Sequence, residues 1–170
     1  TFSSSCIVAA EVMRRFEAQT GEKYPPMPCT PLKRRASPIS QDMDLATLSN
    51  LWSTQAFSEP LSYVNPQPST RGVTKIPTMA SVGSSFMWSI LHYLDSYRVY
   101  QERNFFYYFN TKYSYPSGQV QSVSRKTFDF DTEILSKDLF LIEVNESVIH
   151  SVGFGSLPRF VKHLASVSKK

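Results

Sequence analysis

The second half of the chain alternates apolar runs of strand length with segments of helical spacing, and this alternation limits the choice of fold more than any other feature. Three runs of strand length predict buried strands, IPTMASVG (76–83), NFFYYFN (104–110) and DLFLIEVN (138–145), and NFFYYFN is apolar on both faces. Helices are expected over residues 86–97 and 157–165, with a shorter one capped around Asp131, and a glycine-containing loop over residues 146–156. Strands that are apolar on both faces are typical of parallel sheets. The alternating order predicts an α/β fold with right-handed crossovers.

The first part of the chain has a different character. A helix is expected over residues 3–18, with Gly21 placed to end it, and a short helix over residues 45–52. Between them, YPPMPCTP (24–31) excludes a helix or a central strand, because proline has no N–H donor and a fixed φ. Long irregular connections of this kind are expected to wrap around a domain or to serve its function.

The composition is that of one globular domain, with 170 residues, 41% hydrophobic and 19% charged. We expect a single domain over residues 1–170. Residues 75–170 would form its β-α-β-α-β-α part, and residues 1–74 would supply a helix and loops that wrap around that part.

The net charge of +4 comes from scattered clusters. Because nucleic-acid binders usually concentrate Lys and Arg on one face, no nucleic-acid partner is expected. The start of the chain lacks the pattern of a signal peptide, and no apolar run approaches the roughly 18 residues of a membrane span.

Cys6 and Cys29 are the only two cysteines, and their spacing matches no metal-binding motif. An extended return of the chain after the first helix can bring Cys29 beside Cys6. A disulfide there would indicate an oxidising compartment. Two buried thiols are an equal alternative, so the sequence leaves the pairing open.

The segment VGSSFMWSIL (82–91) takes the chain from an apolar strand through small residues directly into a helix. A sharp turn of this kind exposes a serine and directs helix N-terminal N–H groups at developing negative charge. Gly83 and Ser85 fit a G-x-S arrangement in which Ser85 is the nucleophile. The alternative is a strand-to-helix turn that uses small residues for packing alone.

The histidines do not complete a catalytic pattern. A self-contained serine hydrolase of the GDS type usually carries its base in a D-x-x-H near the C-terminus. Here none of the three histidines, His92, His150 and His163, has an acidic residue three positions earlier. His92 and His163 fall on expected helices, where a surface or core role is favoured. His150 falls in the expected loop, and we expect it not to be catalytic.

Several segments, taken in order, resemble the SGNH-hydrolase-like domains of bacterial alginate O-acetyltransferases and related polysaccharide O-acetylation proteins. The matching segments are SSSCIVAAEVMRRFEAQ, PPMP, QDMDLATL, TMASVGSSFMWSIL, NFFYYFNTKYSYPSG and DLFLIEVNESVIHSVGFG. They cover most of the chain, and their order and spacing carry the resemblance. It implies an SGNH-like (flavodoxin-like) three-layer sandwich with a mainly parallel sheet. The chain would then be the C-terminal part of such a domain, which is incomplete at its N-terminus.

The resemblance implies a polysaccharide O-acetyltransferase or acetyl esterase that forms an acetyl-serine intermediate at Ser85, without a metal or nucleotide cofactor. The oxyanion and substrate contacts would come from Gly83, Phe86, Asn110 and Asn145. The substrate would be a polysaccharide or an acetylated small molecule, and the partners other components of an acetylation or export complex. The implied location is periplasmic or otherwise extracytoplasmic.

The chain departs from the family pattern at the catalytic pair. Family members carry Asp and His in a D-x-H before the serine; here Phe2 stands in the histidine's place, or the pair lies upstream of Thr1. No base or acid is therefore matched within these residues. The second hypothesis is a catalytically inactive SGNH-like module that binds carbohydrate or another partner, with sugar-stacking aromatics from residues 108–115. Glu143 and Glu146 are expected to hold loops through hydrogen bonds.

Overall fold

The computed structural model describes residues 2–30, 32–35, 61–144 and 146–168. They form two compact units. The N-terminal unit comprises Thr1–Lys75 with Ser89–Val99, and the sheet unit comprises Ile76–Trp88 with Tyr100–Lys170. The helix expected over residues 45–52 lies outside the described residues.

The N-terminal unit is built on helix α1, Phe2–Thr20, which confirms the first expected helix. It ends where the sequence indicates, because Gly21 has a φ of 72° and donates its N–H to the carbonyl of Glu17 at 2.9 Å. Glycine adopts this left-handed conformation at little cost, and helices commonly end on it. A two-stranded antiparallel ribbon, β1 (Leu32–Arg35) with β2 (Leu61–Val64), belongs to the same unit.

A disulfide joins Cys6 of α1 to Cys29, with Cα atoms 5.9 Å apart. The sequence left this pairing open, and the structure forms it. The proline-rich segment between the two cysteines is also fixed at its start, where the Tyr24 N–H donates to the Glu17 carboxylate at 3.0 Å. The extended return along α1 is therefore anchored at both ends.

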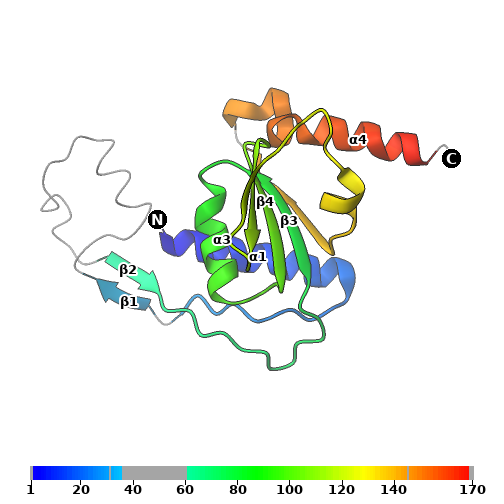
Figure 1. Cartoon of the computed structure of the whole chain (residues 1–170). Coiled ribbons are helices and arrows are strands. Elements are labelled where there is room, and N and C mark those ends of the chain that lie inside the picture. Colours follow the sequence, from blue (N-terminus) through cyan, green and yellow to red (C-terminus); the bar gives the residue numbers. More distant parts are fainter. Residues whose placement is uncertain (1, 31, 36–60, 145, 169–170) are drawn as a thin grey trace, which may run out of the picture. The chain divides into compact units, whose positions relative to one another are not determined.

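The sheet unit contains five strands in the order β6-β5-β4-β3-β7 (Figure 1). Their bounds are Thr78–Gly83 (β3), Glu102–Tyr107 (β4), Thr111–Tyr115 (β5), Val120–Ser122 (β6) and Leu139–Ile142 (β7). Strand β3 pairs in parallel with both β4 and β7, and helix α3 (Met87–Ser96) follows β3 directly. The strand–helix pattern of residues 76–97 is thus confirmed, as is a mixed α/β architecture.

The expectation of a mainly parallel sheet is wrong: β5 pairs antiparallel with both β4 and β6. The expected strand over residues 104–110 ends at Tyr107, because Tyr108 and Phe109 adopt φ values of 49° and 53°. This left-handed pair turns the chain back on itself, so the next strand runs alongside β4 in the opposite direction. Bulky residues rarely adopt a positive φ, so the sequence does not predict a turn at these positions.

Two connections also differ from expectation. The residues expected to form a glycine-containing loop form a 3₁₀ helix, η3, Glu146–Gly155, followed by α4, Ser156–Val167, which confirms the last expected helix. The short helix η2, Asp131–Leu135, is present but is a π-helix. It begins at Asp131, where the sequence indicates, and the Asp129 carboxylate just before it accepts the Thr132 N–H at 3.1 Å.

Alternation along the strands divides the sheet into two packed faces. On one face Ala80, Val82 and Phe106 form a core cluster with Phe109, Phe130 and Ile134, against which Phe160 of α4 packs. On the other face Trp88 makes edge-to-face contacts with Phe105 at 4.7 Å and Tyr113 at 5.0 Å between ring centroids. Aromatic pairs in this geometry add to the stabilisation from apolar burial.

Replacing Cys6 and Cys29 with alanine should lower the free energy of unfolding by about 2–4 kcal/mol, because the bridge restricts the unfolded chain over the segment it closes. Urea denaturation of the oxidised wild type and the double variant measures the difference. The wild type treated with a reductant is the control and should unfold like the variant. Coincident midpoints for the oxidised wild type and the variant would contradict the prediction.

Candidate active site

The carboxyl ends of three parallel strands meet at one edge of the sheet. After β3 and β4, the Tyr108 N–H donates to the Gly83 carbonyl at 2.8 Å, and after β7 the Glu143 N–H donates to the Val82 carbonyl at 2.9 Å. Gly83, Tyr108 and Glu143 are thereby brought side by side. In open α/β sheets, ligand sites form at this edge, where connections leave a central strand to either side.

Gly83 is required by close packing at this edge. A Cβ atom on Gly83 would lie 2.7 Å from the Glu143 carboxylate and 2.8 Å from the Met87 Cβ. Both distances are shorter than real side chains allow, so any larger residue would force the turn away from β7. The absence of a side chain lets the chain pass from strand to helix within three residues.

Ser84 ties the turn to the end of β7. Its hydroxyl donates to one oxygen of the Glu143 carboxylate at 2.5 Å, and its N–H donates to the other at 2.9 Å. Ser84 is only 3% exposed. The expected role of Glu143, holding a loop through hydrogen bonds, is confirmed. Charge-assisted bonds of this length are among the stronger hydrogen bonds in proteins.

Ser85 and Phe86 occupy the exposed part of the turn. Ser85 is exposed and Phe86 is 74% exposed, while the carbonyls of Ser84 and Ser85 accept the first helical hydrogen bonds, from Met87 and Trp88. The Phe86 N–H, one of the expected oxyanion donors, points to the Ser84 hydroxyl at 3.3 Å. A substrate oxygen would have to compete with that hydroxyl for the same donor.

The two asparagines expected near the site have different outcomes. Asn110 lies exposed in the turn between β4 and β5, and its side-chain oxygen accepts a hydrogen bond from the Thr111 hydroxyl at 3.0 Å. Its carbonyl accepts the Val123 N–H at 2.7 Å, so it also organises the turn. Asn145 lies outside the described residues.

The histidines lie on three different elements. The His163 Nε2 of α4 lies 2.9 Å from an Asp131 oxygen of η2, and its ring stacks on Phe130 at 5.5 Å. His92 lies on α3, where its ring meets Tyr93 edge-to-face. The side chain of His150, in η3, is outside what the structure describes. The His163–Asp131 pair is one that sequence spacing could not reveal, because 32 residues separate its members.

Comparison of the chain with models of known protein families, with curated proteins and with solved structures finds no match. Within the described ranges, none of the helices has the length and apolar character to cross a membrane. The same part of the chain holds no group of three or more His, Cys, Asp or Glu side chains arranged for a metal ion. The geometry of the turn and the sequence motifs are therefore the features that bear on the function of this chain.

The two adjacent serines should respond differently to truncation. Ser84→Ala removes a donor from a half-buried carboxylate and should lower the free energy of unfolding by about 1–3 kcal/mol. Ser85→Ala, the matched variant one residue away at an exposed position, should change it by less than about 0.5 kcal/mol. Urea denaturation compares the two variants with the wild type. Equal losses for both would show that the Ser84–Glu143 bond does not stabilise the turn.

Proposed function

We propose that this chain is an SGNH-like domain of a polysaccharide O-acetyltransferase or acetyl esterase, and that Ser85 is its nucleophile. The order of sequence motifs supports the family assignment. The mixed α/β sheet supports it at the level of architecture, since the serine follows a central parallel strand and precedes a helix. Nucleophilic serines commonly occupy such turns.

One observation favours Ser85 over its neighbour. Ser84 is buried, and its hydroxyl is bonded to Glu143, whereas Ser85 is exposed at the same turn. A nucleophile must reach a substrate from solvent, so the buried serine is suited to support and the exposed one to chemistry. The Ser84–Glu143 bond then positions Ser85 by fixing the backbone just before it.

In the proposed reaction the Ser85 hydroxyl attacks the carbonyl carbon of an acetyl ester. The oxyanion that forms lies near the amino end of α3, where the helix dipole favours negative charge. The Phe86 N–H would stabilise it by exchanging the Ser84 hydroxyl for the oxyanion. The donor's alcohol leaves with a proton, and an acetyl-serine remains. A sugar hydroxyl then attacks this ester, which releases Ser85 and leaves the acetyl group on the sugar; water in place of the sugar gives an esterase.

A base must take the Ser85 proton as the bond forms. In the family that the motifs resemble, it is the histidine of a D-x-H segment, which no residues of this chain match. We therefore expect acetylation of Ser85 in this chain to be slow.

The Cys6–Cys29 disulfide supports the proposed setting, because disulfides persist in oxidising compartments. We propose a periplasmic or otherwise extracytoplasmic location, with a polysaccharide or an acetylated small molecule as substrate. Other components of an acetylation or export complex are the proposed partners. The chemistry needs no metal or nucleotide.

A second candidate is an SGNH-like module that binds its partner without catalysis. The observation that favours it is the Phe86 N–H, which already points to the Ser84 hydroxyl rather than outward. In such a module Gly83 and Ser84 are explained by packing and by the bond to Glu143 alone.

Ser85→Ala should abolish acetylation of the turn by p-nitrophenyl acetate. The measurement is mass spectrometry of the peptide that contains residues 84–88, together with release of p-nitrophenol by the chain. Ser166→Ala, at an exposed serine of α4, is the matched control and should behave like the wild type. Acetylation that persists in Ser85→Ala, or a wild type that is not acetylated at Ser85, would favour the binding module.

A further inference from the structure

A polar cavity of about 430 Å³ lies at the end of β4 opposite to the serine turn. Its lining residues all belong to the sheet unit: Glu102, Asn104, Lys112, Ser114, Tyr115, Pro116, Ser117, Thr132, Glu133 and Lys137. The volume is within the range of small-molecule sites. Because Glu102 begins β4 and the serine turn adjoins its other end, the cavity is separate from the candidate active site.

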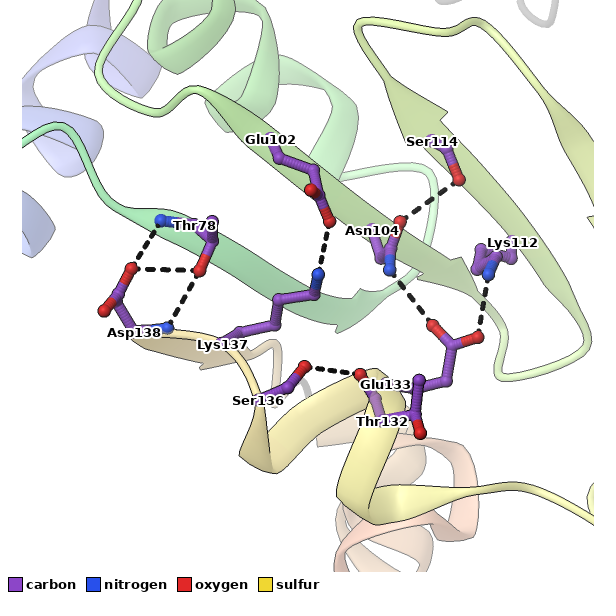
Figure 2. A network of polar contacts seen from close by, with 10 residues as sticks. All are labelled: Thr78, Glu102, Asn104, Lys112, Ser114, Thr132, Glu133, Ser136, Lys137 and Asp138. Carbon is purple, nitrogen blue, oxygen red and sulfur yellow. Dashed lines mark hydrogen bonds and ion pairs between the residues drawn. The ribbon is translucent and has the colours of Figure 1, made fainter.

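The strand register explains why polar side chains gather here. Asn104 lies opposite Ser114 in the β4–β5 pair, and Phe106 lies opposite Lys112, so these four side chains share one face of the sheet. Toward the carboxyl edge this face is covered by the apolar core cluster. Toward the other edge it changes to polar residues, and η2 with Lys137 supplies the facing wall (Figure 2).

Hydrogen bonds between side chains hold the centre of the cavity in place without a ligand. One oxygen of the Glu133 carboxylate accepts from the Lys112 ammonium at 2.7 Å, and the other accepts from the Asn104 amide at 3.0 Å (Figure 2). The Ser114 hydroxyl donates to the Asn104 carbonyl oxygen at 3.1 Å. The Lys112 and Glu133 side chains are 17% and 21% exposed, so the pair is largely removed from solvent yet still reachable.

The charges in the cavity cancel. Lys112 pairs with Glu133, and Lys137 pairs with Glu102, so two cations face two anions (Figure 2). An anionic or a cationic ligand would therefore gain no net attraction and would disrupt an existing pair. An uncharged ligand rich in hydroxyl groups gains hydrogen bonds from both partners, since an ammonium has three donors and a carboxylate several acceptor sites.

A smaller hollow of about 190 Å³ shares Lys112 and Glu133 with the cavity. Its other lining residues are Phe106, Gln121, Ser122, Val123, Ser124, Thr127, Phe128 and Asp129. The Asp129 carboxylate adds one negative charge to this hollow, which further disfavours an anionic ligand, and it already accepts two hydrogen bonds from Thr132, at 2.7 and 3.1 Å. Amide and hydroxyl groups of Gln121, Ser122, Ser124 and Thr127 line it beside two aromatic rings, so a ligand of more than one unit can contact both hollows.

We propose that these two adjoining hollows bind an uncharged oligosaccharide, with one sugar unit held against the Lys112–Glu133 pair. The larger hollow lies at the other end of β4 from the serine turn, and the proposal does not depend on acyl transfer by Ser85. A chain that modifies or binds a polysaccharide would hold the polymer here, outside its reactive edge.

The test is titration of the whole isotope-labelled chain, followed by amide resonances, with three uncharged probes: cellotetraose, maltotetraose and mannotetraose. Tetragalacturonate is the charged counterpart. At least one uncharged probe should shift the amide resonances of Lys112, Ser114 and Ser117. Lys112→Met should weaken that binding about tenfold, because it removes a charge-assisted hydrogen bond. Lys126→Met, at an exposed lysine outside both hollows, is the matched control and should leave it unchanged.

The shifts in the wild type locate the site even if Lys112→Met fails to fold. The proposal is overturned if no uncharged probe moves these resonances, or if tetragalacturonate binds more tightly than all three. It is also overturned if a folded Lys112→Met binds as the wild type does. Acetylation by p-nitrophenyl acetate that persists in Ser85→Ala would overturn only the proposal for the serine turn, so the two proposals fail separately.

Discussion

The close approach of Gly83 to Glu143 is the constraint on which the sheet unit depends. It allows β3 to lie between two parallel neighbours and still turn at once into α3. The Glu143 carboxylate fills the space that a side chain would take and binds the backbone and hydroxyl of Ser84. One missing Cβ thus determines the turn, the burial of one serine and the exposure of the next.

Much of this unit could be predicted from local patterns. The strand that ends at Gly83, the helix after it and the last helix each follow from apolar spacing within their own residues. Strands β5 and β6 could not, because TKYSY mixes half-buried tyrosines with polar residues and resembles a loop. The turn that directs them depends on left-handed Tyr108 and Phe109, a conformation imposed by tertiary packing rather than by residue type.

The candidate site was predictable only in part, for a related reason. Small residues at a strand end identify Gly83 and Ser85, but nothing near Ser84 in the sequence indicates its partner. Glu143 lies 59 residues later and reaches Ser84 only because β7 pairs with β3. The polar cavity was missed in the same way, since Asn104 and Lys112 share a face only once the antiparallel register of β4 and β5 is known.

The disulfide has a consequence for chemical probing of both sites. The two cysteines of the chain are joined to each other and belong to the N-terminal unit, so the sheet unit has no sulfhydryl of its own. A cysteine introduced at the serine turn or at the rim of the polar cavity would be the sole reactive thiol. Thiol-specific labels, spin probes or crosslinkers could then be attached at either edge of the sheet without altering a native residue elsewhere.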